Sequence, residues 1–143
     1  MTTSNLRRAP VLFVSYGGGP YAVLGAPHHR EMVKLCQDVR WVFDNVKGVI
    51  VLTAHWETEV PHILHSPEPG VWYDYTEEAS GDLPEGAWEI EYPAKGDVKL
   101  AEAVKARFDE HDLNPVLDDK RDWDHGVWVP LKMLRPKADL PVV

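Results

Sequence analysis

The sequence predicts an α/β fold, a mostly parallel central sheet with flanking helices. Two continuous apolar runs, Val11–Val14 and Val49–Leu52, are typical of strands buried on both faces. Between them, apolar residues recur at three- and four-residue spacing, which predicts a helix of about four turns. These residues are Met32, Leu35, Cys36, Val39 and Phe43. Strand, helix and strand in this order predict a parallel pair joined by a right-handed crossover.

The later elements follow from the same kind of pattern. Val60–Leu64 comes soon after the second strand, and this short connection predicts an antiparallel neighbour. Asp97 is a typical helix cap and precedes an amphipathic stretch, which predicts a helix over residues 97–111. Two further strands are predicted at Val116–Leu117 and at Leu140–Val143.

One domain over residues 11–143 is expected, because a chain of 143 residues supports a single hydrophobic core. Residues 1–10 are polar and are expected to form a disordered N-terminal tail. The last predicted strand begins only three residues before Val143, so the natural domain is expected to be longer, with this chain truncated at its C-terminus. An unpaired core strand also invites pairing with another chain, so self-association through this strand is expected.

The composition excludes several classes of protein. A net charge of −8 and the lack of a dense Lys/Arg cluster are not typical of proteins that bind nucleic acid or anionic membranes. The single cysteine, Cys36, cannot form an internal disulfide or a multi-cysteine zinc site. No apolar run is long enough for a signal-peptide core or a membrane span. A cytoplasmic location is therefore expected.

His55 is the first candidate site residue. It follows the apolar run Val49–Leu52 closely, which places it at the carboxyl end of a strand, where ligands bind in open α/β sheets. Imidazole is the commonest metal ligand near neutral pH. The structural alternative is a half-buried histidine bonded to the backbone. A zinc deaminase is excluded, because His55-Trp56-Glu57 is not followed by the required pair of cysteines.

His125, in Asp124-His125-Gly126, is the second candidate. Asp124 could orient the imidazole, and Gly126 would let a ligand approach the backbone. Trp123 and Trp128 could form walls for an aromatic substrate. The structural alternative is a loop histidine before a helix whose tryptophans belong to the core. We expect the imidazoles of His55 and His125 to face a common pocket at one edge of the sheet.

Five segments together resemble the class III extradiol ring-cleavage dioxygenases, in the branch that includes DOPA extradiol dioxygenase and the LigB-type catalytic subunits. The resemblance runs in order over nearly the whole chain. Its segments are Val11–Pro20, Val49–Trp56, Tyr73–Tyr75, Tyr92–Asp97 and Asp124–Leu131.

The resemblance implies an enzyme that uses O2 and one non-haem divalent metal, Fe(II) or Zn(II), to cleave a catechol ring beside its paired hydroxyls. His55 matches a metal ligand, and His125 matches the histidine of the substrate site, to which we assign acid/base catalysis. Asp124 and Trp128 are expected beside the substrate. The family has a further ligand histidine after its first strand, where this chain has Tyr16. A phenolate can bind iron only if its pKa falls far below about 10.

This departure leaves three hypotheses. The first is an extradiol dioxygenase acting on DOPA or a related catechol. This chain alone is then expected to be inactive or nearly so, because Tyr16 replaces a ligand histidine and the C-terminal half of the family domain is missing. The second is a non-catalytic homologue that binds an aromatic ligand or a partner subunit. The third is a zinc-dependent hydrolase.

Overall fold

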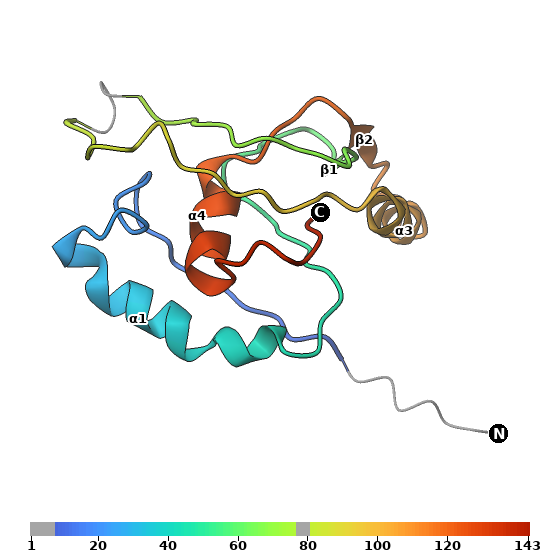
Figure 1. The fold of residues 1–143 in the computed structure, drawn as a ribbon. Helices are drawn as coiled ribbons and strands as arrows, with labels where there is room; N and C mark the ends of the chain where they lie inside the picture. Colours follow the sequence, from blue (N-terminus) through green and yellow to red (C-terminus); the bar gives the residue numbers. More distant parts are fainter. Residues whose placement is uncertain (1–7, 77–80) are drawn as a thin grey trace.

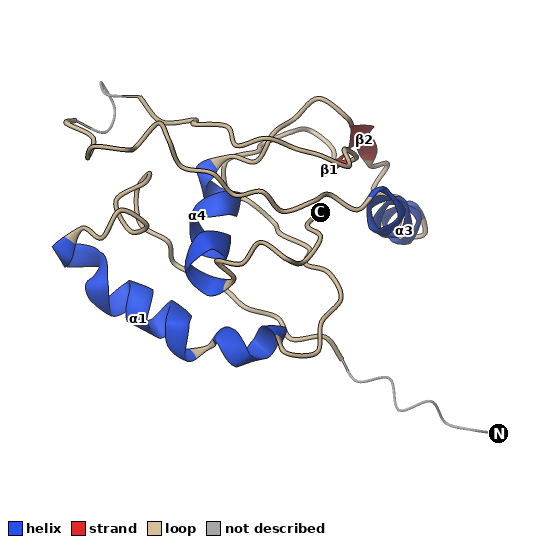
Figure 2. Ribbon diagram, viewed as in Figure 1, coloured by secondary structure: helices blue, strands red, loops and turns tan. Residues whose placement is uncertain are grey.

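The computed structural model describes residues 8–76 and 81–143, so residues 1–7 of the predicted tail lie outside the described residues. Loops make up most of the described chain (Figure 2). Its α-helices are α1, α3 and α4, and its strands are β1 and β2 (Figure 1). Two short 3-10 helices, η1 and η2, come before and after α1. Their bounds are η1 Pro27–His29, α1 Arg30–Asp38, η2 Arg40–Phe43, β1 His62–Leu64, α3 Val98–Asp109, β2 Val116–Asp118 and α4 His125–Leu134. The predicted α/β class is confirmed.

Strands β1 and β2 form a parallel pair, with His62 opposite Val116 and Leu64 opposite Asp118. The predicted antiparallel pairing of residues 60–64 with residues 49–52 is therefore not found in the described part of the chain, because β1 pairs with β2 instead. This strand follows β1 after α3, and a helical connection returns the chain in the same direction. The predicted strand at Val116–Leu117 is confirmed.

The C-terminal segment also pairs in parallel, with residues 49–51. The Val49 N–H donates to the Pro141 carbonyl at 2.9 Å, and the Val51 N–H donates to the Val143 carbonyl at 2.8 Å. Only isolated bridges form here, at Val142 with Val49 and with Gly96, so neither predicted strand is complete. The parallel direction predicted for the central sheet holds for every pair found among the described residues.

The predicted burial of the first two strands on both faces is wrong. Residues 11–14 form no strand, and Val11 and Phe13 are fully exposed. Leu52 is exposed as well. Within the described part of the chain no backbone hydrogen bond joins residues 11–14 to a neighbouring segment. The side chains of Val11, Phe13 and Leu52 are therefore not covered by another described segment.

The first predicted helix is divided into α1 and η2. The chain leaves the α-helical conformation at Val39. The Arg40 guanidinium then donates to the Met133 carbonyl at the end of α4, with its Nε at 2.9 Å. Cys36 and Phe43 are buried as the apolar stripe predicts, whereas Leu35 is exposed.

Helix α3 begins as predicted. The Asp97 side chain accepts a hydrogen bond from the Leu100 backbone N–H at 3.0 Å, which satisfies a free donor of the first turn. Helix α3 packs on β1 and β2, on the far side of α4 from α1 (Figure 1). Together these contacts fix the end of β2 and the loop that leads into α4.

Helix α4 is the centre of the core. Nine of its ten residues are buried, and Trp128 and Val129 have no exposed surface. In Figure 1 it runs between α1 and the long loops that contain β1 and β2. Its first residue is His125, so the fold fixes the start of this helix, and with it His125, against the surrounding layers. No helix in residues 8–76 and 81–143 is long and apolar enough to cross a membrane.

Candidate functional site

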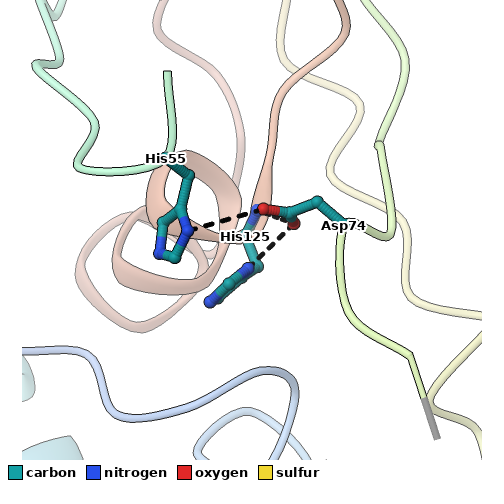
Figure 3. Close-up of side chains that lie close together, drawn as sticks. All are labelled: His55, Asp74 and His125. Atoms are coloured by element: carbon teal, nitrogen blue, oxygen red, sulfur yellow. Dashed lines mark hydrogen bonds and ion pairs between the residues drawn. The ribbon is translucent and has the colours of Figure 1, made fainter. Parts of the chain in front are cut away.

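Three side chains from distant parts of the chain meet at the start of α4: His55, Asp74 and His125. The imidazole centroids of His55 and His125 are 4.1 Å apart, with an angle of 47° between the rings. Asp74 faces both rings (Figure 3). The expected proximity of the two imidazoles is confirmed. They lie in a loop after residues 49–52 and at the N-terminus of α4, respectively.

Asp74 fixes the orientation of His125. One carboxylate oxygen, Oδ1, accepts from the His125 backbone N–H and lies 2.8 Å from its ring Nδ1. The ring therefore donates through Nδ1 and leaves Nε2 as the free acceptor. Burial alone would raise the pKa of the Asp74 carboxyl, but the hydrogen bonds and the charge of His125 outweigh it, so its pKa lies below the usual value. Asp74 is therefore a carboxylate at neutral pH.

His55 is the more open of the two histidines, with 36% of its side chain exposed. Its Nε2 lies 2.8 Å from the Tyr16 hydroxyl, and its Nδ1 lies 3.8 Å from Asp74 Oδ2. The His55 backbone N–H donates to the Thr53 hydroxyl at 3.1 Å. Asp74 thus presents Oδ1 to His125 and Oδ2 to His55.

Tyr16 lies beside both histidines, 6.1 Å from the His55 ring and 5.8 Å from the His125 ring between centroids. Burial raises the pKa of its phenol, and the charges of Asp124 and Asp74 raise it further. Tyr16 is therefore a neutral phenol at pH 7. This protonation state disfavours Tyr16 as a metal ligand, and its hydroxyl lies at hydrogen-bond distance from His55 Nε2.

Asp124 and Trp128 are placed differently from the expectation. The carboxylate that contacts the His125 ring belongs to Asp74, because Asp124 is turned away and fully buried. Asp124 accepts from the Thr53 hydroxyl at 2.7 Å and from Arg121 at 3.1 Å. Trp128 is part of the core, which is the structural alternative for this tryptophan. Direct contact of either residue with a substrate stays a prediction.

Gly126 provides space for the His55 loop. A Cβ at this position would lie 2.5 Å from the Thr53 hydroxyl oxygen and 2.8 Å from His55 Cδ2. The prediction was that a ligand would approach the backbone at Gly126. In the structure it is the protein's own Thr53 and His55 that do so.

Gly126→Ala is therefore expected to displace His55 from Asp74 and to lower stability by about 1–3 kcal/mol through overpacking. Urea unfolding gives the stability change, and the ring resonances of His55 in an NMR spectrum report the displacement. Gly18→Ala is the matched control, because a Cβ there meets nothing within 4 Å. Unchanged His55 resonances in Gly126→Ala would contradict this account.

Asp74 was not proposed from the sequence as a site residue. It was only one member of the segment Tyr73–Tyr75 in the resemblance, and nothing local shows that it reaches His125, 51 residues away. Arg121 and Thr53 were also missed, since both contact the His55 backbone and Asp124 and neither contacts the three ligand side chains by a hydrogen bond. For Asp74, the only signal in the sequence is its place between two aromatic residues, Tyr73 and Tyr75.

The side chains of His55, Asp74 and His125 are suited to a divalent metal. Each offers one ligand atom, and these atoms lie within 4.8 Å of one another. Two imidazoles and a carboxylate are a donor set that suits Fe(II) and Zn(II). The side chain of His55 is partly exposed, so an ion and a small ligand could reach the group from solvent.

Comparison with known protein families agrees with this chemistry. A family described as the catalytic LigB subunit of aromatic ring-opening dioxygenase matches residues 9–143. The chain belongs to the LigB family. The members that this family describes are catalytic subunits of aromatic ring-opening dioxygenases. LigB membership implies a metal, and the His55, Asp74 and His125 group could bind one.

Individual LigB relatives give the same family. The chain is 36% identical over 143 residues to the dioxygenase tasH of Hapsidospora irregularis, covering 94% of this chain and 43% of the relative. It is 40% identical over 97 residues to a 4,5-DOPA dioxygenase extradiol of Portulaca grandiflora, covering 67% and 34%. A protein of the same name from Escherichia coli (strain K12) is 28% identical over 138 residues, covering 95% and 46%. The chain thus spans less than half the length of these curated relatives.

Proposed function

We propose that this site binds a catechol together with a divalent metal and supports extradiol cleavage of the ring by O2. The single observation that carries the proposal is the convergence of His55, Asp74 and His125, with Asp74 between the two imidazoles. In this reaction the ring bond beside the paired hydroxyls breaks and both oxygen atoms of O2 enter the product. The names of the curated relatives, 4,5-DOPA dioxygenase extradiol, support DOPA or a related catechol as the substrate.

The metal would be held by the His55 ring and by one Asp74 oxygen, Oδ2, which is not the oxygen bonded to His125. Fe(II) or Zn(II) fits these donors. When bound, Fe(II) would bring the catechol oxygens and O2 together and let electrons pass from the ring to oxygen, whereas redox-inactive Zn(II) would only polarise the bound oxygens. A third ligand, the His125 ring, is allowed by the 4.8 Å separation of the three ligand atoms.

His125 is proposed to act as the acid/base residue. Its Nδ1–H is engaged by Asp74, so Nε2 is available to accept a proton from a catechol hydroxyl and to return it to the product. Asp74 stabilises the protonated ring that results, and it holds the ring against rotation. One carboxylate would thus serve the metal through Oδ2 and the proton transfer through Oδ1.

Turnover by this chain is expected to be slow, because Tyr16 stands where the family resemblance places a ligand histidine. The raised pKa of Tyr16 keeps its phenol neutral and leaves the metal with few protein ligands. This favours one rival, a homologue that binds an aromatic ligand without turnover. Metal analysis separates the two: bound iron with O2 uptake supports the enzyme, whereas the absence of bound metal supports the rival. Bound zinc with ester or amide cleavage would support a hydrolase.

Tyr16→His is expected to raise Fe(II) affinity by about tenfold or more, because a neutral imidazole replaces a neutral phenol beside His55. O2 uptake with catechol or DOPA, and formation of a yellow ring-opened product, should rise with it. Both are measured after anaerobic loading with Fe(II).

Tyr16→Phe is the matched control for this change. It removes the hydroxyl next to His55 without adding a ligand, so its metal affinity should not increase. Equal Fe(II) affinity in Tyr16→His and Tyr16→Phe would show that position 16 is not at the metal. Fast turnover by the unmodified chain would contradict the expected ligand deficit.

A further inference from the structure

The Arg121 guanidinium lies over the rings of two tryptophans, and the side chain is largely buried, with 16% of it exposed. Its guanidinium carbon is 4.7 Å from the ring centroid of Trp56 and 4.4 Å from that of Trp72. A guanidinium at these distances over two aromatic rings is attracted by each of them. Trp56 directly follows His55 in the chain, and Trp72 lies two residues before Asp74.

The same guanidinium joins two parts of the site by hydrogen bonds. One terminal nitrogen donates to the His55 carbonyl at 3.2 Å and to Asp124 Oδ2 at 3.1 Å. The other Asp124 oxygen, Oδ1, accepts from the Thr53 hydroxyl, which in turn accepts from the His55 N–H. Both backbone polar groups of His55 are thus held in a closed ring of hydrogen bonds that includes the residue before His125.

We propose that Arg121 is a positioning residue that sets the separation between His55 and the Asp74–His125 pair. It contacts the loop of His55 through a hydrogen bond and Trp56, the segment of Asp74 through Trp72, and the start of α4 through Asp124. The hydrogen bonds of the Arg121 guanidinium go to the His55 carbonyl and to Asp124. None of them goes to the side chains of His55, Asp74 or His125, which would meet metal or substrate. The expected effect of Arg121 on metal binding rests on the proposed function, whereas its effect on the positions of the two rings does not.

The arrangement needs arginine specifically. The planar guanidinium can lie over both indole rings while one terminal nitrogen donates to two acceptors. A lysine ammonium retains the charge but has no planar face and no fork of donors. Arg121→Lys therefore tests position and shape at constant charge. Arg107→Lys is the matched control, because Arg107 is exposed on α3 and pairs only with Glu110 among the contacts described.

The first measurement uses the metal-free protein. In Arg121→Lys the ring resonances of His55 and His125 are expected to shift in an NMR spectrum, whereas Arg107→Lys leaves them unchanged. Trp72→Leu removes one of the two indole rings and is expected to shift the same resonances less; it also serves if Arg121→Lys does not fold. Ring resonances that match the unmodified protein in both folded variants would overturn the proposal, whether or not a metal binds.

The second measurement is titration with Co(II), whose visible absorption reports its coordination. Arg121→Lys is expected to lower Co(II) affinity by about tenfold and to change the absorption spectrum, at a temperature where circular dichroism shows a folded protein. A purely structural role would lower Tm and leave affinity and spectrum unchanged in the folded protein, which would overturn the proposal. If the unmodified chain binds no Co(II), the proposed function fails, and the NMR shifts alone decide the role of Arg121.

Discussion

His55→Ala is expected to lower the affinity for Co(II) or Fe(II) by on the order of 100-fold, the largest effect of any single change at the site. His55 is the most accessible member of the cluster, and its ring lies between Tyr16 and Asp74. Because Tyr16 is a neutral phenol, it cannot replace the lost imidazole. Equilibrium dialysis followed by metal analysis measures the loss.

Two further histidine variants make this result specific. His62 lies on β1 and its ring is near the carboxylate of Asp118, at 3.7 Å, rather than that of Asp74, so His62→Ala is the matched control and should retain the metal affinity of the unmodified chain. His125→Ala separates two roles. If His125 transfers protons, metal affinity should change less than about threefold while ring opening is lost, since acid/base catalysis contributes about 10²–10⁴-fold. A loss of affinity equal to that of His55→Ala would make His125 a third ligand.

Asp124→Ala is expected to destabilise the fold by about 3 kcal/mol, because it removes one partner of a buried ion pair. Asp124 has almost no exposed surface and accepts from both Thr53 and Arg121. The substitution would leave the Arg121 charge without its carboxylate in a largely buried position and free the Thr53 hydroxyl. Urea unfolding monitored by tryptophan fluorescence gives the free energy of unfolding.

Asp38→Ala is the matched control for this prediction. Asp38 pairs with Lys34 at the surface of α1, and exposed pairs of this kind contribute at most about 1 kcal/mol. A similar small loss in both variants would show that the buried ring around His55 does not stabilise the start of α4.

The sequence predicts those parts of the fold that depend on local patterns. The Asp97 cap and the strand at residues 116–117 follow from neighbouring residues, and both are found. Placing His55 after one apolar run and His125 before a helix was enough to predict that their rings lie close together, and they do. They meet between a loop and the start of α4, because residues 49–52 form no complete strand.

Features that depend on distant contacts could not be predicted in this way. The direction of β1 is set by pairing with β2, which lies beyond a whole helix in the chain. The apolar character of Val11 and Phe13 indicates a strand, but a strand needs a neighbour to supply hydrogen bonds, and no described segment does so. Asp74 rather than Asp124 orients His125 because the chain folds back over 51 residues, and adjacency in sequence favoured the wrong carboxylate.

The central claim is that a catechol and a divalent metal share the site formed by His55, Asp74 and His125. Co(II) titration in the presence of catechol tests it directly, with resorcinol as the comparison, because only adjacent hydroxyls can place two oxygens on one ion. We predict that catechol tightens Co(II) binding and changes its visible spectrum in the unmodified chain, and that resorcinol and the His55→Ala variant show neither effect. Equal responses to catechol and resorcinol, or an unchanged response in His55→Ala, would contradict the claim.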